Sequence, residues 1–236
     1  MEALPTRVRI NLLGGFELKC ECERVAVPLG ARRLLAYLAL QDGGTHRAVI
    51  AERLWPDSLP ARAGANLRSA LWRGRRVGFY TTIECHGPRL RLADAVTIDL
   101  RESLDQLGRL EQVGPSTLLR MTEALQSELL PDWSDDWLTL ERERWEQTRL
   151  HGLEQLAGRL LSQAEYLAAL QTALGAGAIE PIHEAAHRIV IEVHIAEGNV
   201  ASALRHYQRY RALLQRELGV TPSPRMAHLV RPLMPT

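Results

Sequence analysis

The chain has 236 residues, of which 46% are hydrophobic and 24% charged, and its formal net charge is +1. This composition is typical of a globular protein with one large domain or two ordinary ones. The longest apolar run, residues 34–40, is too short to span a bilayer, and the first ten residues lack the basic start and apolar core of a signal peptide. We therefore expect a cytoplasmic protein that does not bind a membrane.

The small net charge conceals an uneven distribution along the chain. Residues 1–95 hold 15 Lys and Arg against 9 Asp and Glu, a net of +6, whereas residues 96–236 hold 14 against 19, a net of −5. A basic segment joined to an acidic one suggests that the first part binds a polyanion. Almost all the basic residues are arginine, which suits phosphate and guanine recognition. The alternative is a solvated surface with uneven charge.

Before residue 96, we expect a small sheet, three helices and a hairpin. Residues 7–28 alternate in hydrophobicity around a Gly14-Gly15 break, which predicts a small antiparallel sheet. Apolar residues at helical spacing predict helices over residues 31–41, 47–55 and 62–78. Residues 79–93 read as two strands around Gly87-Pro88. This order is that of an α+β winged helix-turn-helix, so residues 1–95 are expected to form a DNA-binding domain.

The third predicted helix supplies the candidate DNA-binding face. At about 100° per residue, Leu67, Ala70, Leu71 and Gly74 share one face, which we expect to pack inward. The residues expected to contact DNA are Arg62, Asn66, Arg68, Ser69, Trp72, Arg73, Arg75 and Arg76, together with Arg89 beside the hairpin tip. Arginine can bond guanine bidentately, asparagine can bond adenine, and the remaining cations can meet phosphates. The alternative is an ordinary amphipathic surface helix.

Residues 96–236 are expected to be entirely helical. The predicted helices cover residues 99–111, 115–127, 136–163, 164–174, 180–196 and 199–218. A weak internal repeat places Ala169-Leu170 and Ala203-Leu204 34 residues apart, and Tyr207 follows where tetratricopeptide repeats place an aromatic residue. We therefore expect a tetratricopeptide-like all-α domain. The alternative is another kind of helical bundle.

The stretch "HEAAH", His183 to His187, fits the H-E-x-x-H motif of zinc proteases. His183 and His187 are one helical turn apart and could share a metal, but His194 is about 10 Å further along the axis. The longer protease pattern fails, because Val190 and Val193 stand where it needs glycine and histidine. A zinc hydrolase remains the alternative function. The favoured interpretation is a helix flank whose histidines line a groove between repeats, with no metal.

The cysteines and tryptophans do not indicate a cofactor site. Cys20 and Cys22 would share one face of a strand, but no second Cys/His pair at zinc spacing supports a metal site. Three cysteines in the chain suggest no disulfide framework. The tryptophans expected to anchor the core of the second half are Trp133, Trp137 and Trp145. No cofactor is expected.

Longer strings of sequence carry a family resemblance over nearly the whole chain. In the first half they are "LLGGFEL", "VPLGARRLLAYLAL", "HRAVIAERLWPD", "ANLRSALWRGRR" and "HGPRLRL"; in the second half they are "LLPDWSDDWLTLERERWEQTRLHGLEQLA" and "EGNVASALRHYQRYRALLQRELGVTPSPRM". Their order and spacing resemble the Streptomyces antibiotic regulatory protein family. In that family an OmpR-type winged helix precedes a bacterial transcriptional activation domain.

The resemblance implies a transcriptional activator rather than an enzyme. Such a protein binds repeats in double-stranded promoter DNA, recruits RNA polymerase with its sigma factor, can associate with itself on DNA, and serves a secondary-metabolite gene cluster. The loop between the second and third helices faces polymerase in such folds; here it contains Pro56, Asp57, Ser58, Leu59 and Pro60. An alternative is a regulator that acts through protein contacts alone and keeps a vestigial DNA-binding domain.

One position departs from the family pattern. Gly74 stands where the family usually has a large apolar residue. Glycine in a helix interior costs about 1 kcal/mol relative to alanine. The geometry of the last turn, and with it the placing of Arg75 and Arg76, depends on this residue.

Overall fold

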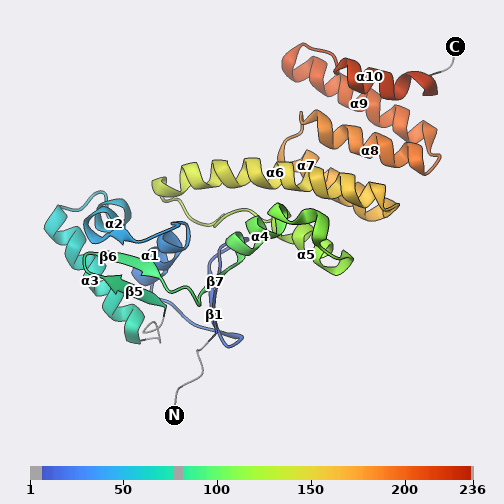
Figure 1. The fold of residues 1–236 in the computed structure, drawn as a ribbon. Helices are drawn as coiled ribbons and strands as arrows, with labels where there is room; N and C mark the ends of the chain where they lie inside the picture. Colours follow the sequence, from blue (N-terminus) through green and yellow to red (C-terminus); the bar gives the residue numbers. More distant parts are fainter. Residues whose placement is uncertain (1–6, 77–81, 235–236) are drawn as a thin grey trace. The chain divides into compact units, whose positions relative to one another are not determined.

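The computed structural model describes residues 7–76 and 82–234, which form mostly helices with two small sheets (Figure 1). The chain divides into two compact units. The N-terminal unit is Met1–Gly108 with Ser127–Glu143, and the C-terminal unit is Arg109–Gln126 with Arg144–Thr236. The units are therefore interleaved in sequence, whereas the sequence analysis placed a single boundary between residues 95 and 96. Within the described ranges, no helix has the length and hydrophobicity that crossing a bilayer requires.

The first sheet of the N-terminal unit has four strands in the order β3-β2-β1-β7. The strands are β1 (Val8–Asn11), β2 (Glu17–Cys20), β3 (Glu23–Arg24) and β7 (Thr97–Ile98). The predicted antiparallel arrangement is confirmed for β1, β2 and β3. Strand β7, which pairs in parallel with β1, was not predicted. Cys22 follows β2 in a turn with φ 89°, so the expectation that Cys20 and Cys22 share a strand face was wrong.

Three helices and a second sheet complete most of this unit. The elements are α1 (Leu29–Ala39), β4 (Thr45–His46), α2 (Arg47–Leu54), α3 (Pro60–Arg76), β5 (Ile83–His86) and β6 (Arg89–Leu92). The second sheet has the order β4-β6-β5, and β5 and β6 form the predicted antiparallel hairpin, with Gly87 at a positive φ of 59° in its turn. The predicted parts of the third helix and of the hairpin at residues 77–81 lie outside the described residues.

Helix α1 lies at the centre of the core of the N-terminal unit. Its buried residues are Ala31, Leu34, Leu35, Ala36, Tyr37, Leu38 and Ala39. Helix α2 buries Ile50, Ala51 and Leu54, but Val49 is 44% exposed and Arg53 is exposed. Helical spacing alone predicts that Val49 and Arg53 share a buried stripe with Ile50 and Leu54; this was partly wrong, because α2 is short and only its face toward α1 and α3 is covered.

The segment 127–143 packs on the N-terminal unit although it follows residues 109–126, which belong to the C-terminal unit. Arg142 donates hydrogen bonds to the carbonyl oxygens of Leu129, Leu130 and Trp133. The rings of Trp133 and Phe16 lie 5.9 Å apart, and those of Trp137 and Tyr37 lie 5.4 Å apart at their centroids. Two of the predicted aromatic anchors therefore serve the N-terminal unit, where they are half-buried.

Helix α4 (Asp99–Gly108) begins at a carboxylate that joins two segments of the N-terminal unit. Asp99 accepts hydrogen bonds from the backbone N–H groups of Leu12 and Leu13, at 2.9 to 3.0 Å, and from that of Leu100, at 2.7 Å. These bonds fix the end of β1 against the start of α4.

The C-terminal unit is helical. Its helices are α5 (Pro115–Gln126), the greater part of α6 (Thr139–Ser162), α7 (Tyr166–Ile179), α8 (Glu184–Ala196), α9 (Val200–Leu218) and α10 (Pro224–Val230). Successive helices from α7 to α10 pack on one another. Both small residues of the predicted repeat, Ala169 and Ala203, are fully buried.

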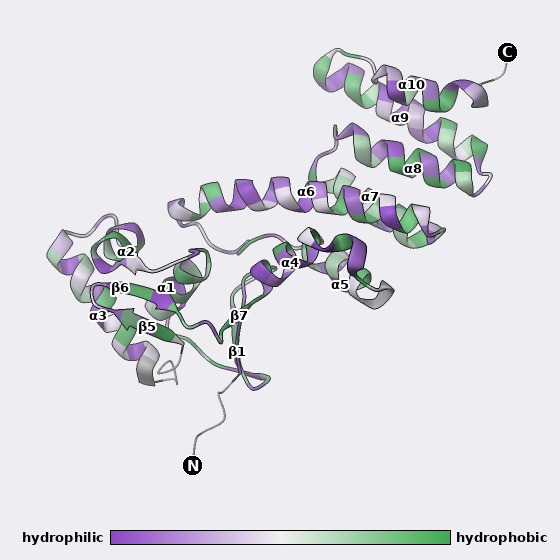
Figure 2. Ribbon diagram, viewed as in Figure 1, coloured by the Kyte–Doolittle hydropathy of each residue, from purple (hydrophilic) through white to green (hydrophobic). Residues whose placement is uncertain are grey.

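Helix α10 was missed by the sequence analysis, although its start carries a local signal. Ser223 accepts a hydrogen bond from the Met226 N–H, and Pro224 occupies the first helical position. The core here contains Ile191, Ala203, Tyr207, Tyr210, Leu214, Met226 and Val230. In Figure 2, α9 carries hydrophobic and hydrophilic residues along its whole length, as an amphipathic helix should.

Candidate nucleic-acid interface

Helix α3 is held in place by its inward face. Ala63, Leu67 and Ala70 are 2 to 3% exposed and Gly74 is buried, while Leu71 is half-buried. The helix packs against both α1 and α2. It begins at Pro60 rather than at residue 62, because proline has no N–H to leave unpaired at the first helical position.

The opposite face of α3 is polar and basic. Arg62, Arg68, Ser69, Trp72 and Arg73 are exposed, with Trp72 58% exposed, whereas Asn66 is half-buried. The helix contains no acidic residue. In the parts of the chain that the structure describes, Arg62, Arg68 and Arg73 form no ion pair. The side chains of Arg75 and Arg76 lie outside the described residues.

The hairpin contributes one further cation. Arg89 is exposed, and its Nη1 donates to the carbonyl oxygen of Gly44 at 2.8 Å. Its charge meets no carboxylate among the described residues. Arg91, by contrast, pairs with Glu84 at 2.6 Å and with Asp94 at 3.0 Å, so its charge is neutralised locally.

The loop between α2 and α3 presents a compact exposed surface. Pro56, Asp57 and Leu59 are exposed, with Leu59 at 80%, and the Ser58 N–H donates to the Trp55 carbonyl oxygen at 3.1 Å. Pro60, predicted as part of this loop, is the first residue of α3.

Two hollows border this loop, and the sequence analysis did not indicate either of them. One, of about 610 Å³, lies between the loop and residues 134–137. The other, of about 660 Å³, runs between α2 and α3 and is lined by Arg47, Arg68, Glu52 and several apolar residues.

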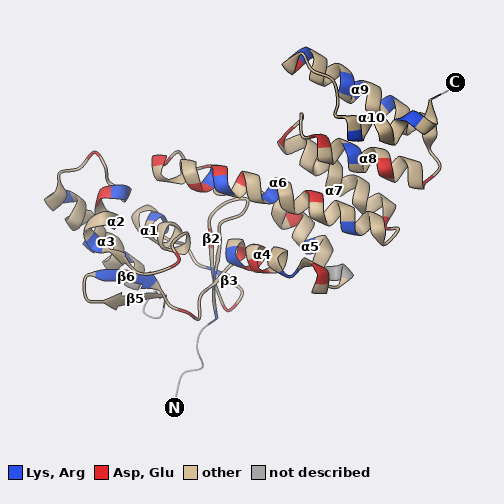
Figure 3. Ribbon diagram, turned by 45° about the horizontal axis from the view of Figure 1, so that its top comes forward, with Lys and Arg blue, Asp and Glu red and all other residues tan. Residues whose placement is uncertain are grey.

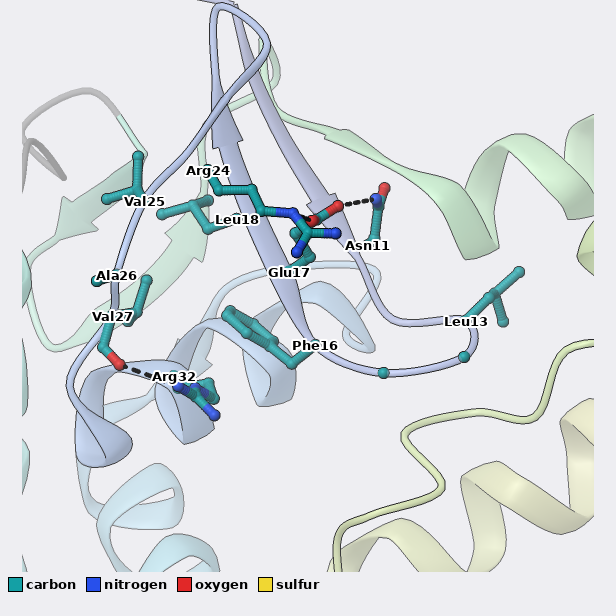
Figure 4. Close-up of a pocket in the computed structure, with 12 residues that line it drawn as sticks. Asn11, Leu13, Phe16, Glu17, Leu18, Arg24, Val25, Ala26, Val27 and Arg32 are labelled. Carbon is teal, nitrogen blue, oxygen red and sulfur yellow. Dashed lines mark hydrogen bonds and ion pairs between the residues drawn. The ribbon is translucent and has the colours of Figure 1, made fainter.

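A third hollow, of about 550 Å³, lies beside the turn between β1 and β2 (Figure 4). Glu17 in this hollow pairs with Arg24, accepts a hydrogen bond from Asn11 at 2.9 Å and contacts Lys19 at 2.8 Å. These partners, Lys19 first, lower the pKa of Glu17. Because Arg24 is already paired, the hollow offers a polyanion much less free positive charge than α3 does.

The two histidines of the "HEAAH" stretch take different hydrogen-bond partners. His183 precedes α8 and its Nε2 lies 3.3 Å from Glu154 Oε2, while His194 lies 3.8 Å from Glu197. His187 donates from Nε2 to the Pro181 carbonyl oxygen at 2.8 Å, so its Nδ1 accepts from the Nε2–H of His206 at 3.0 Å. The predicted helix from 180 begins at Glu184, and the three histidines take separate partners. No cluster of three or more His, Cys, Asp or Glu among the described residues is arranged to hold a metal.

The second half of the chain matches a known family of protein domains. Residues 118–233 match the sequence model of the bacterial transcriptional activator domain. Two curated relatives are both regulatory protein AfsR. The one from Streptomyces griseus is 26% identical over 208 residues, which cover 84% of this chain and 21% of the relative. The one from Streptomyces coelicolor is 26% identical over 235 residues, which cover 94% of this chain and 24% of the relative. The chain thus spans less than a quarter of the length of either relative.

A solved structure shows the same fold. Mycobacterium tuberculosis EmbR, in complex with a low affinity phosphopeptide, superposes with a TM-score of 0.74 over 97% of this chain and 65% of that chain, at 18% sequence identity. Residues 118–233 are therefore similar to a bacterial transcriptional activator domain. The matches together confirm the chain's resemblance to the Streptomyces antibiotic regulatory protein type of regulator.

Proposed function

We propose that the chain is a sequence-specific DNA-binding transcriptional activator, not an enzyme, that binds promoter repeats in the cytoplasm and recruits RNA polymerase with its sigma factor. The observation that carries the proposal is the exposed face of α3, on which Arg62, Arg68 and Arg73 lie without carboxylate partners among the described residues. The resemblance to antibiotic regulators suggests a secondary-metabolite gene cluster as the target, and binding to repeats suggests self-association on DNA.

The arrangement of elements supports a winged helix-turn-helix. In this interpretation α2 and α3 form the helix-turn-helix, α3 lies in the major groove, and the β5–β6 hairpin is the wing. Arg68 and Arg73 would read base edges, while Arg62 in the first turn and Arg89 on the hairpin would contact phosphates. The N-terminal unit would then form the DNA-binding domain, and the C-terminal unit the tetratricopeptide-like activator domain.

Two arginine substitutions test the DNA interface. Arg73→Ala is expected to weaken binding to promoter DNA by about 1–3 kcal/mol, roughly tenfold to a hundredfold, if its side chain reads a base. Arg89→Ala should weaken binding to all duplexes alike, because phosphates carry no sequence information. Fluorescence anisotropy with a footprinted promoter fragment and a scrambled duplex measures both effects.

Arg24→Ala is the matched control for these variants. Arg24 is an 82% exposed arginine of the same unit, outside α3, and it pairs with Glu17. Its replacement removes the same charge and should leave promoter affinity nearly unchanged. Wild-type affinity in both Arg73→Ala and Arg89→Ala would contradict the proposed interface and favour a regulator that acts through protein contacts alone.

The loop between α2 and α3 is proposed to contact RNA polymerase. Pro56 and Pro60 restrict its conformation, so a partner loses little entropy in ordering it. Leu59 offers an apolar side chain, 80% exposed, beside the charge of Asp57.

Changing Asp57, Ser58 and Leu59 together to alanine is expected to preserve promoter affinity and to lower transcript yield several-fold. Both quantities are measured in vitro on one protein preparation, with Leu29→Ala as a control that removes another exposed leucine, 68% exposed, from the same unit. Normal transcription by the triple variant would mean that the loop is only a connector. A parallel loss of DNA binding would place the loop in the DNA interface instead.

A further inference from the structure

The charge of the C-terminal half is divided between two regions of opposite sign. Residues 96–197 hold 18 acidic and 8 basic residues, a net of −10, whereas residues 198–236 hold six arginines and one glutamate, a net of +5. In Figure 3, α9 and α10 are marked mainly by basic residues, while α6 and α8 carry acidic and basic residues together. The net of −5 for the half as a whole therefore conceals a basic surface.

Three of these arginines form a line on α9, called here the arginine stripe: Arg205, Arg209 and Arg216. Their spacings of four and seven residues place them within about 40° of one another around the helix, over about 16 Å of its length. All three are exposed. The other side of α9 contributes Ala203, Tyr207, Tyr210 and Leu214 to the core with α8 and α10, so burial fixes which way the stripe faces.

The charges of this surface are available to a partner. Within the described part of the chain, Arg209, Arg211, Arg225 and Arg231 form no ion pair. Arg205 donates only to the neutral Ser202 hydroxyl, at 3.0 Å. Arg216 contacts Glu217 at 2.8 Å, but these side chains are 71% and 49% exposed, and such a surface pair contributes little.

The residues around the stripe decide what kind of partner fits it. Protein interfaces generally have an apolar or aromatic core surrounded by a polar rim. Here Ala212 lies between Arg209 and Arg216, and the exposed Gln208 and Gln215 lie beside them. The exposed large apolar residues of α9, Val200 and Leu218, stand at its two ends. A surface of arginines without an apolar centre suits a regular polyanion better than a folded protein.

Duplex DNA is a polyanion of suitable spacing. Each strand carries one phosphate per about 3.4 Å of axis, so a stripe of about 16 Å would extend past roughly five phosphates. Guanidinium groups bind phosphate oxygens bidentately and remain charged at any physiological pH.

We propose that the arginine stripe of α9 is a second, sequence-independent DNA-binding surface that contacts the phosphate backbone. The inference rests on the proposed function, in which α3 supplies the specific contact. The proposal gives residues 96–236 a direct part in DNA binding. The net charge of −5 of these residues conceals this role. Promoter affinity then depends on DNA that extends beyond the site contacted by α3.

The test replaces Arg205, Arg209 and Arg216 by glutamine in the full chain. Removing three phosphate contacts should reduce the steepness of log affinity against log salt by about two to three. Affinity for a promoter duplex that extends beyond the footprint is measured at several salt concentrations between roughly 50 and 200 mM, the range in which phosphate contacts dominate. Thermal melting followed by circular dichroism verifies that the variant is folded.

Two controls separate a local contact from overall charge. Changing Gln112, Gln163 and Gln171, which are exposed and outside α9, to glutamate alters the net charge by the same three units and should leave the slope nearly unchanged. The corresponding Arg→Lys triple variant keeps the charge and should retain most of the slope. An equal loss of slope in the glutamate variant would overturn the local contact.

The remaining outcomes are distinguishable from failure of the proposed function. An unchanged slope in the glutamine variant, with promoter affinity still sensitive to Arg73→Ala, overturns the second surface alone. An unchanged slope with loss of self-association in sedimentation would overturn it in favour of a second copy of the chain as the partner. A wild-type chain that binds no duplex DNA at all would overturn both proposals.

Discussion

Asp99→Ala is expected to lower the free energy of unfolding of the N-terminal unit by about 2–4 kcal/mol. The carboxylate accepts hydrogen bonds from three backbone N–H groups, those of Leu12, Leu13 and Leu100. Burial raises the pKa of Asp99, and the three N–H donors oppose this rise by favouring the ionised form. Alanine would leave those three donors without a partner where little water reaches them, which is costlier than losing the bonds themselves.

The loss is measured by urea unfolding, followed through tryptophan fluorescence. Asp94→Ala is the matched control, because Asp94 is an 84% exposed aspartate of the same unit that pairs with Arg91. It should change stability by less than about 1 kcal/mol. Asp99→Asn keeps one accepting oxygen and should lie between alanine and wild type. Equal stabilities of Asp99→Ala and Asp94→Ala would show that the three hydrogen bonds do not hold the end of β1.

The second large effect is a loss of stability of the C-terminal unit in mild acid. Burial lowers the pKa of His206 to about 4, because it disfavours the charged imidazolium, and repulsion between that charge and His187, Arg209 and His194 lowers the pKa further. Burial also lowers the pKa of His187, which stacks on Tyr210 at 4.2 Å. Both imidazoles are therefore neutral in the folded protein at pH 7, and they share the hydrogen bond between His206 Nε2–H and His187 Nδ1.

The direction of the pH effect follows from the unfolded chain, in which histidine has a pKa near 6.5. Between about pH 6.5 and about pH 4 the unfolded chain binds a proton that folded His206 does not, so acid favours unfolding. Stability is complete above pH 6.5 and is lost as the pH falls through this window, by about 2–3 kcal/mol.

The test compares pH profiles of urea midpoints for the wild type and for His206→Gln between about pH 7.5 and pH 4. The glutamine variant should start less stable at neutral pH but lose less on acidification. His228→Gln, which removes an exposed histidine of the same unit, should follow the wild type. Carboxylates also protonate at the acid end in both proteins. The effect of His206 is therefore the difference between the wild-type profile and the His206→Gln profile. Parallel profiles for His206→Gln and wild type would contradict the buried neutral pair.

Local sequence signals determined most of the helices and the hairpin. Apolar residues at helical spacing located α1, α3 and α9 to within a few residues, and Gly87-Pro88 located the turn between β5 and β6. The inward face of α3 followed from the same spacing, since Leu67 and Ala70 are buried. These features depend on periodicity within one segment, which the sequence displays directly.

The tertiary structure alone decided the pairings between distant segments. Strand β7 has two residues, too few for any periodic pattern, and it forms only because β1 offers it a parallel edge. Asp99 accepts hydrogen bonds from the backbone N–H groups of Leu12 and Leu13, which lie 86 to 87 residues earlier in the sequence. Likewise, the partner of His187 is His206 on the next helix rather than His183 on its own stretch.

The surface charge of the C-terminal half depends both on the sequence and on the packing of the helices. The sequence contains all six arginines of residues 198–236, but averaging them with the preceding acidic residues conceals them. Only packing determines that Tyr207, Tyr210 and Leu214 turn into the core, which leaves the arginine stripe in solvent. A helix displays its own periodicity in sequence, whereas the side that neighbours cover depends on which other segments bury it.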